Sequence, residues 1–534
     1  MGTTKFIFIT GGVVSSLGKG ITAASIGLLL KRRGFSVVNQ KLDPYLNIDP
    51  GTMNPFQHGE VFVTEDGGET DLDLGHYERF TDVALHRYNS TSAGKVYQTI
   101  LERERAGGYH GGTVQVVPHV TDEIKRRILQ ATESSPDFII VEIGGTVGDI
   151  EAQPFIEAIR QIRFDAGKEN TVFIHLGLLP YLKSCGEVKT KPMQHSVKEL
   201  LSFGIQPDIL VCRCEEKITD AVREKLSLFS NVAVTAIIEN RNARSIYEVP
   251  LLLEQNGLGS VLCEMFHLGD IKPNLDDWRE MVNSYNNPTK EVSIALVGKY
   301  IELHDAYLSV IEALTAASIQ HNAKLTVGYC NASDITDISV AREKLSGFDG
   351  ILVPGGFGER GVEGMIIAAQ FAREEKIPFF GICLGMQISV IEFARHILSL
   401  KDANSTEFDQ NTTHPVIDLM PDKLGKQIGG TLRLGLYPCT LLDGSIAQQA
   451  YAGKKEVQER HRHRYEFNNA YREQFEQAGM VFSGMNSESN LVEIIELKDH
   501  PHFLATQFHP EFTSRPNKPQ ALFSYFIAHA LKTR

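Results

Sequence analysis

Short apolar runs alternate with longer helical patterns along nearly the whole 534-residue chain. The apolar runs are rich in β-branched and aromatic residues, as in Phe6–Ile9, Phe138–Val141, Thr171–Leu176, Ile209–Cys212, Gly350–Val353 and Phe379–Gly381. Such alternation is typical of βαβ units, which build a mainly parallel sheet covered by helices. The sequence therefore predicts an α/β protein, and at roughly 150 residues per domain its length favours about two to four domains.

One polar stretch interrupts this alternation near the middle of the chain. It runs from Leu268 to Lys290, contains two prolines and the only tryptophan, and precedes a new apolar run that begins at Val292. Prolines and Asn-rich turns mark the ends of regular elements. We therefore predict a first module over 1–267, a linker over 268–290 and a second module over 291–534.

The composition argues against several classes of protein. The chain carries 53 Lys and Arg against 66 Asp and Glu, a formal net charge of −13, whereas duplex nucleic-acid binders usually present a basic face. No apolar run approaches the ~20 residues that span a bilayer, and the N-terminal run lacks the features of a signal peptide. Seven scattered cysteines fit a reducing compartment better than a disulfide framework. We expect a cytoplasmic protein with no nucleic-acid or membrane partner.

The N-terminal sequence has the form of a phosphate-binding loop. An apolar run ends at Gly11, a glycine-containing loop carries Lys19, and a helix is predicted to begin near Ile21. Backbone N–H groups and a helix N-terminus bind phosphate, and the lysine pairs with the β- and γ-phosphates. The loop departs from the strict motif in two ways: five residues, not four, separate Gly12 from Gly18, and Gly20 follows Lys19 where Ser or Thr is expected. We favour a nucleoside triphosphate site over a plain strand–turn–helix.

Acidic residues that could hold the accompanying Mg²⁺ occur in two places. Asp71 and Asp73 lie in an acidic, glycine-rich loop, and Glu142 ends a buried apolar run. Mg²⁺ prefers carboxylates and water, and open α/β sheets bind ligands at the carboxyl ends of their strands. The spacing favours Glu142 as a metal ligand and leaves the choice between the two aspartates open.

The second module carries the elements of a cysteine amidase. Cys383 lies between a predicted strand and a helix and is flanked by Gly381 and Gly385, which is the form of a nucleophile elbow. His509 and Glu511 follow another predicted strand. A helix N-terminus lowers the pKa of a thiol, a histidine activates it, and a carboxylate orients the imidazole. Attack of this thiolate on a carboxamide would release ammonia.

A glycine-rich stretch of the second module, Ile351–Gly364, admits two interpretations. Backbone N–H groups near Gly356 and Phe357 could form an oxyanion hole. The same stretch matches the G-x-G-x-x-G fingerprint of dinucleotide-binding proteins through Gly356, Gly358 and Gly361. Because the nucleophile elbow and the His-x-Glu pair lie in the same module, we prefer the amidase interpretation.

Two basic segments are ambiguous from their spacing. Lys189 and Lys191, with Thr190 and Gln194, could bind a second polyphosphate or form a surface lysine pair. The cluster RHRHRYE at 460–466 could be a solvated basic face or could hold a substrate carboxylate beside the amidase.

Longer stretches of the sequence resemble known families. GICLGMQ, VPGGFGERG and FHPEF resemble the class I glutamine amidotransferases, whereas GGVVSSLGKG, VEIGGTVGDIE, GEVKTKPMQHSVKELL and ERHRHRYE resemble the CTP synthase family. The resemblance covers nearly the whole chain in the same order. It implies an N-terminal P-loop-type parallel-sheet synthase domain that binds ATP and UTP, and a C-terminal class I glutamine amidotransferase α/β domain.

This resemblance also implies an activity, the last step of de novo CTP synthesis in pyrimidine biosynthesis. A glutamine-hydrolysing C–N ligase would convert UTP, ATP and glutamine to CTP, ADP, phosphate and glutamate. The family further implies Mg²⁺, allosteric activation by GTP, feedback inhibition by CTP and a homotetramer with nucleotide sites at subunit interfaces.

The resemblance assigns site residues by their positions. The catalytic triad would be Cys383, His509 and Glu511. The ATP site would comprise Ser16, Leu17, Gly18, Lys19, Gly20, Ile21, Asp73, Arg241, Asn242 and Ala243. The UTP or CTP site would comprise Ser15, Asp149, Ile150, Glu151, Lys189, Thr190, Lys191, Pro192, Met193, Gln194 and Lys225. Glutamine would contact Gly356, Leu384, Gly385, Met386, Gln387, Glu407 and Arg464. Mg²⁺ would bind Asp73 and Glu142.

The implied reaction requires that ammonia reach the uracil ring without entering bulk water. Uracil O4 is a poor leaving group until ATP phosphorylates it, after which ammonia can replace the phosphate at C4. Ammonia released into water would largely be protonated, so we expect a sequestered route between the modules.

Two alternative functions remain for the sequence. One is an amidotransferase of similar layout that acts on a carboxylate of a cobalamin precursor. The other is a P-loop switch ATPase of the partitioning type with a degenerate amidase.

Overall fold

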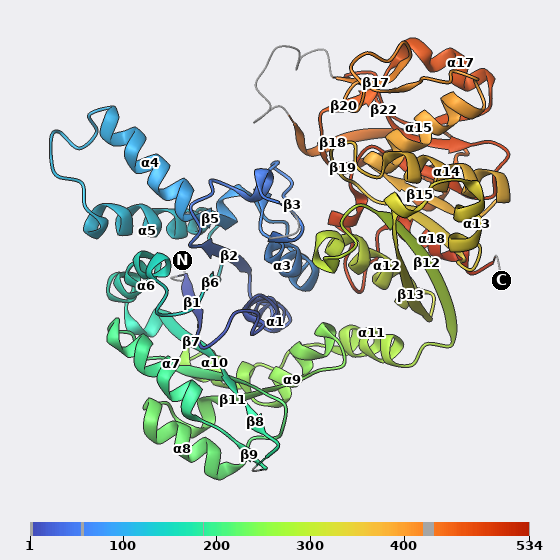
Figure 1. The fold of residues 1–534 in the computed structure, drawn as a ribbon. Coiled ribbons are helices and arrows are strands. Elements are labelled where there is room, and N and C mark those ends of the chain that lie inside the picture. Colours follow the sequence, from blue (N-terminus) through green and yellow to red (C-terminus); the bar gives the residue numbers. More distant parts are fainter. Residues whose placement is uncertain (1–3, 55–57, 185, 420–431, 533–534) are drawn as a thin grey trace. The chain divides into compact units, whose positions relative to one another are not determined.

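The structure is a computed structural model that describes residues 4–54, 58–184, 186–419 and 432–532. The chain divides into two compact units, coloured along the sequence in Figure 1. Unit 1 comprises Met1–Met53 and Thr70–Val282, and unit 2 comprises Asn54–Glu69 and Asn283–Arg534. Among the described helices, none combines the length and the apolar character that crossing a bilayer requires.

Within the described residues, unit 1 is built on a seven-stranded sheet in the order β11-β10-β7-β1-β6-β2-β5. All neighbouring pairs in this sheet are parallel, as the alternating sequence predicts. The strands are β1 Lys5–Gly11, β2 Val37–Asp43, β5 Ser90–Ser92, β6 Phe138–Ile143, β7 Thr171–Leu179, β10 Ile209–Cys214 and β11 Ile237–Arg241. The central strands are apolar on both faces because helices cover both sides of the sheet.

The helices of unit 1 fall into two groups. One group shares an apolar core with Phe6 and Phe8 of β1 and comprises α4 Ala93–Arg105, α5 Thr121–Gln130, α6 Gln153–Ala166 and α7 Lys191–Ser202. Side chains alternate along a strand, so Ile7 and Ile9 point to the other face. There α1 (Lys19–Lys31) contacts α3 Asp73–Thr81, α9 Val249–Gln255 and α10 Leu258–Met265. Unit 1 also contains α8 Asp220–Ser230, β8 Tyr181–Leu182 and β9 Glu187–Val188. The short strand β3 Phe62–Val63 belongs to unit 2, and β4 Glu69–Thr70 and α11 Asp276–Asn286 each cross a boundary between the units.

In the described part of unit 2, a nine-stranded sheet has the order β13-β12-β14-β15-β23-β22-β21-β18-β19. The first five strands of this order are parallel, and the remaining pairs are antiparallel, which the sequence pattern does not predict. The strands are β12 Lys290–Gly298, β13 Ala323–Asn331, β14 Gly350–Val353, β15 Phe379–Ile382, β18 Arg433–Leu441, β19 Glu456–His463, β21 Met480–Asn486, β22 Leu491–Leu497 and β23 Phe503–Thr506. A small separate sheet holds β16 Asn404–Ser405, β17 Pro415–Leu419 and β20 Tyr465–Phe467.

Two apolar cores lie against this larger sheet. One core contains side chains of α13 Ile338–Leu345, α14 Val362–Glu375, α15 Leu384–His396 and α17 Arg472–Gln477. The other contains side chains of α12 Leu308–Gln320, α16 Ile446–Ala450 and α18 Ala521–Ala530. Figure 1 shows α14 and α15 running along the strands they cover, as a helix does after a parallel strand.

A short segment from early in the chain belongs to unit 2, although the sequence places it within the first module. The carboxylate of Glu60 accepts hydrogen bonds from the Ser309 backbone N–H at 3.1 Å and from its hydroxyl at 2.6 Å. The ring of Phe62 packs edge-on against Phe512, with ring centroids 5.1 Å apart. These contacts bridge long distances in the sequence, so local patterns do not reveal them.

Candidate active sites

Cys383 occupies a strained turn between β15 and α15. Its φ is 52°, a left-handed conformation that is uncommon for a residue with a side chain. Side chains at the two flanking glycines would collide with neighbours, at Gly381 with Ala505 and at Gly385 with the carbonyl of Val353. The glycines therefore allow the close packing that holds the thiol at the N-terminus of α15.

The imidazole of His509 lies near Cys383 and is hydrogen-bonded to a buried carboxylate. Its Nδ1 lies 2.7 Å from Glu511 Oε1, and its Nε2 has no hydrogen-bond partner among the described residues. Burial alone would lower the pKa of His509, but Glu511 and then Cys383 outweigh it and raise this pKa to about 10. A side chain at Gly355 would come 2.8 Å from His509 Cε1 and 3.7 Å from Cys383 Cβ. The structure thus brings the three predicted triad residues together.

The loop after β14 is fixed by two charged side chains. Gly358 N–H donates to Glu407 Oε1 at 2.8 Å. Lys299 donates to the carbonyls of Phe357, at 3.1 Å, and Gly358. Burial lowers the pKa of Lys299 to about 8 and raises the pKa of Glu407. Lys299 was not predicted as a site residue, although its position just after the carboxyl end of β12 is typical of a ligand-facing residue.

Strand β19 and the residues after it line the thiol. The Arg462 carbonyl lies 4.0 Å from Cys383 Sγ, and Gln387 Nε2 donates to the Tyr465 carbonyl at 3.2 Å. The Nε of Arg464 is buried and has no hydrogen-bond partner among the described residues. Most of β19 is buried, so the basic cluster is not a solvated face. Leu384 and Met386 are also buried.

In unit 1 the predicted phosphate loop leads directly into α1. Gly18 has a φ of 86° and precedes the helix, which begins at Lys19, two residues before the predicted start. The Lys19 ammonium donates to the carbonyl of Gly145, and burial lowers the pKa of Lys19. A side chain at Gly20 would collide with the carboxylate of Asp73. This collision explains why glycine stands where the strict motif has Ser or Thr.

A buried lysine of β2 lies among acidic residues at the ends of β2 and β6 and near the start of α3. The Lys41 ammonium is hydrogen-bonded to Asp73 and lies 3.4 Å from Glu142 Oε1, 3.7 Å from Asp43 Oδ1 and 3.8 Å from Asp71 Oδ1. Both candidate aspartates therefore belong to one cluster with Glu142. Lys41 and Asp43 were not predicted as site residues, because no strand was predicted over β2, at whose carboxyl end both residues lie.

The charges in this carboxylate cluster compensate one another only in part. Burial, followed by repulsion from Asp73, raises the pKa of Glu142 to about 7, and the Tyr77 hydroxyl donates to Glu142 Oε2. Burial would raise the pKa of Asp73, but Lys41 and His76 outweigh it and lower that pKa. The described residues form no ready-made group of three or more metal-ligating side chains. The oxygen donors nevertheless fit a hard cation such as Mg²⁺.

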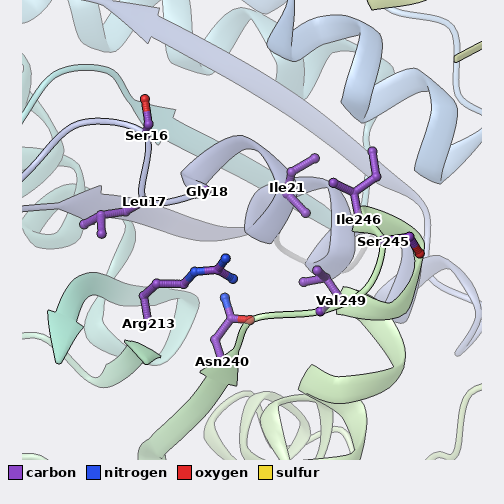
Figure 2. Close-up of a pocket in the computed structure, with 10 residues that line it drawn as sticks. Ser16, Leu17, Gly18, Ile21, Arg213, Asn240, Ser245, Ile246 and Val249 are labelled. Atoms are coloured by element: carbon purple, nitrogen blue, oxygen red, sulfur yellow. The ribbon is translucent and has the colours of Figure 1, made fainter. Parts of the chain in front are cut away.

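A pocket of about 180 Å³ lies beside the phosphate loop. Figure 2 shows the side chains of Arg213 and Asn240 extending into it from the ends of β10 and β11. The lining residues are Ser16, Leu17, Gly18, Ile21, Arg213, Asn240, Ala243, Ser245, Ile246 and Val249. Five of the predicted ATP residues do not line it, namely Lys19, Gly20, Asp73, Arg241 and Asn242. Arg241 Nε instead pairs with Glu239 at 2.8 Å.

The two groups of residues predicted for the pyrimidine nucleotide also lie near each other. Asp149 accepts hydrogen bonds from Thr146 at 2.8 and 2.6 Å, in a loop that begins beside the phosphate loop. A side chain at Gly148 would come 3.3 Å from Glu199 of α7. The first turn of α7 carries Lys191, Pro192, Met193 and Gln194, and the Gln194 amide donates to Thr190 Oγ1 at 2.9 Å. Ile150 is exposed, Lys189 pairs with Glu187 at 2.6 Å, and Lys225 lies on the adjacent helix α8.

A phosphate-loop unit joined to a cysteine amidase unit defines an ATP-dependent glutamine amidotransferase. Residues 5–268 match the family described as CTP synthase N-terminus, and residues 302–529 match the glutamine amidotransferase class-I family. A CTP synthase of Treponema denticola is 68% identical to the chain, and one of Bacillus licheniformis is 57% identical, each over 99% of both sequences. The chain belongs to the CTP synthase family, which confirms the resemblance and favours it over the two alternatives.

Solved structures that resemble part of the chain include a glutaminase domain. It is the glutaminase domain of the Trypanosoma brucei protein with bound acivicin, which is 40% identical. The match covers 45% of this chain and 94% of that one, with a TM-score of 0.43.

Proposed function

We propose that the chain aminates UTP to CTP with ATP, using ammonia that it releases from glutamine. The observation that carries this proposal is the buried Cys383–His509–Glu511 arrangement in a chain whose other unit holds a phosphate loop. The 68% identity to a CTP synthase over 99% of the chain supports the choice of substrate. Assays for CTP with ATP, UTP and glutamine, each omitted in turn, test it. CTP formation without any one of the three would contradict it.

Unit 2 would supply the ammonia. The Cys383 thiolate attacks the glutamine carboxamide, and the His509 imidazolium gives its proton to the departing ammonia. Water then hydrolyses the acyl-thioester to glutamate. Backbone N–H groups near Gly356 and Phe357 would bind the oxyanion. Glutamine itself would be held by Gly356, Leu384, Gly385, Met386, Gln387, Glu407 and Arg464.

Unit 1 would use the ammonia. Ser16–Ile21 would hold the phosphates of ATP, with Lys19 as the counter-charge, and the pocket beside Ala243 would take the base. The γ-phosphoryl group passes to uracil O4, ammonia adds at C4, and phosphate leaves. The pyrimidine nucleotide would contact Ser15, Asp149, Ile150, Glu151, Lys189, Thr190, Lys191, Pro192, Met193, Gln194 and Lys225.

Mg²⁺ would bind at the carboxylate cluster through Asp73 and Glu142. The cluster gathers more acidic groups than the single Lys41 ammonium neutralises, and carboxylate oxygens are the ligands that Mg²⁺ prefers. When bound, the ion would offset the negative charge of the triphosphate. Tyr77 and Lys41 would orient the two carboxylates by their hydrogen bonds.

Regulation, assembly and location complete the proposal. GTP would activate glutamine hydrolysis and CTP would inhibit by feedback, as in the family. A homotetramer is proposed from the family, and exposed apolar side chains on unit 1 could contribute to subunit contacts, such as Phe164, which is 88% exposed, and Leu228, which is 80% exposed. We place the protein in the cytoplasm, and the cysteines that the structure describes are free, as in a reducing compartment. We retain 1–267, 268–290 and 291–534 as the functional modules.

A further inference from the structure

A fully buried histidine beneath the phosphate loop has no part in the proposed chemistry. His175 lies on β7, directly beside Thr10 in the parallel register of β1 and β7, and its exposed fraction is 0%. Its Nδ1 is 2.8 Å from Thr10 Oγ1, and its Nε2 is 2.7 Å from Ser196 Oγ. A buried ring that uses both nitrogens joins the elements on either side of it and fixes their relative position.

The partners of the ring indicate its protonation state. Burial, with a smaller effect of Lys19, lowers the pKa of His175 to about 3. The ring is therefore neutral, with one donor and one acceptor nitrogen. The Thr10 hydroxyl lies 3.4 Å from the Ile174 carbonyl, to which it donates. This leaves Nδ1–H to donate to Thr10 and the Ser196 hydroxyl to donate to Nε2, so every polar atom in the chain of contacts is satisfied.

The two ends of this chain of contacts carry the two proposed nucleotide sites. Thr10 lies at the end of β1, just before the phosphate loop begins at Gly12. Ser196 lies on α7, two residues after Gln194 in the segment proposed for the pyrimidine nucleotide. The phosphate loop also rests directly on α7, because a side chain at Gly12 would collide with Ser196 Oγ. A shift of the loop cannot leave α7 unaffected.

We infer that His175 is a positioning residue that couples ATP binding at the phosphate loop to pyrimidine-nucleotide binding at α7. The inference rests on the proposed function, because it requires both nucleotides to bind unit 1. An ATP-induced adjustment of the loop passes through Thr10 and His175 to Ser196 and the first turn of α7. Such coupling is reciprocal and typically changes affinity by about 5–150-fold. An ATP analogue therefore tightens UTP binding by the factor by which UTP tightens binding of the analogue.

Three substitutions separate the two halves of this link. His175→Asn places an amide near the position of Nδ1 and keeps the contact with Thr10. His175→Gln places an amide near the position of Nε2 and keeps the contact with Ser196. His175→Phe removes both contacts and keeps the bulk of the ring. His502→Phe is the matched control, because His502 is also a buried histidine, 1% exposed, but lies in unit 2.

The experiment is calorimetric titration of the full-length protein with UTP, with and without a non-hydrolysable ATP analogue and Mg²⁺. We expect the analogue to tighten UTP binding at least about fivefold in the wild type and in His502→Phe. In His175→Phe this factor falls to about 1, while the affinity for each nucleotide alone changes by less than about threefold. In His175→Asn and His175→Gln we expect the analogue to tighten UTP binding less than in the wild type. If His175→Phe does not fold, these two variants provide the test.

Several results would overturn the inference. The first is that the ATP analogue tightens UTP binding in the His175 variants as much as in the wild type. The second is that the analogue does not tighten UTP binding in the wild type. The third is that the His175 variants lose affinity equally for UTP alone and for the ATP analogue alone. The last result would assign His175 a merely structural role. Absence of UTP binding, or of CTP formation from ammonium chloride by the wild type, would refute the proposed function as well. Coupled binding that survives in His175→Phe refutes only the inference.

Discussion

The Asp73 carboxylate fills the space that a side chain at Gly20 would need. Gly20 is the second residue of α1, and Asp73 is the first residue of α3. The phosphate loop of this chain therefore has an acidic residue from another helix where the strict motif has a hydroxyl. This contact joins the proposed ATP site to the carboxylate cluster.

Restoring the strict motif is expected to damage the enzyme. Gly20→Ser should lower CTP synthesis from ammonia by about tenfold or more, because an overpacked site costs about 1–3 kcal/mol and displaces Asp73. Glutamine hydrolysis should persist. Steady-state assays with ammonium chloride and with glutamine measure both effects, and Gly347→Ala serves as the control because a side chain there meets nothing within 4 Å. Full synthesis in Gly20→Ser would show that Asp73 does not need its observed position.

The carboxylate cluster predicts a competition between Lys41 and a divalent cation. Lys41→Met leaves buried carboxylates without their ammonium, which is expected to destabilise unit 1 by about 3–5 kcal/mol. Added Mg²⁺ should raise the melting temperature of this variant more than that of the wild type. Thermal unfolding with and without Mg²⁺ checks this, with the exposed Lys198→Met as a control. An equal Mg²⁺ effect in all three proteins would place the metal elsewhere.

The raised pKa of His509 predicts how removal of the Glu511 carboxylate changes the pH dependence of glutamine hydrolysis. Glu511 holds the imidazolium form, so Glu511→Gln should lower the pKa of His509 from about 10. The alkaline limb of glutaminase kcat/KM should then move to lower pH, and kcat should fall by about 10²–10⁴-fold, as for other triads that lose their acid. Glu488→Gln, at an exposed position, should change neither property. An unshifted alkaline limb would mean that the profile reports another group.

Buried neutral histidines predict a loss of stability in acid. Burial lowers the pKa of His502 to about 3, below the value of about 6.5 in an unfolded chain. The unfolded state therefore binds more protons below about pH 6.5, so the stabilising contribution is complete above that pH and is lost as the pH falls toward 3. Between pH 7 and 5, His502→Phe should lose about 2 kcal/mol less stability than the wild type.

Urea unfolding at the two pH values measures this difference, and His110→Phe is the control because His110 is exposed. An identical loss in the wild type and His502→Phe would show that His502 is protonated in the folded protein without cost.

The sequence predicted residues that belong to local motifs better than residues that meet by folding. The nucleophile elbow and the His-x-Glu pair could be recognised because the spacing itself encodes the turn and the strand end. Lys41 and Lys299 were missed because their roles depend on partners on other elements. Arg213 was missed for the same reason, since it reaches its pocket only when β10 and β11 lie side by side.

The parts of the fold that depend on neighbouring elements in the sequence could be predicted, and the parts that depend on distant contacts could not. Alternating strands and helices predict the parallel sheet of unit 1, because βαβ units pack locally along the chain. The antiparallel strands of unit 2 have no such local signature. The sequence also gives no local sign that Asn54–Glu69 belongs to unit 2. That placement depends on contacts between residues far apart in the sequence, such as the hydrogen bond between Ser309 and Glu60.

The central claim is that one unit releases ammonia through a thiolate and the other unit consumes it. The most direct test is the Cys383→Ala variant, assayed for CTP formation with ATP and UTP and with either glutamine or ammonium chloride as the nitrogen source. We predict no glutamine-dependent CTP formation and a rate with ammonium chloride close to that of the wild type. Loss of both activities, or CTP formation from glutamine at the wild-type rate, would contradict the account.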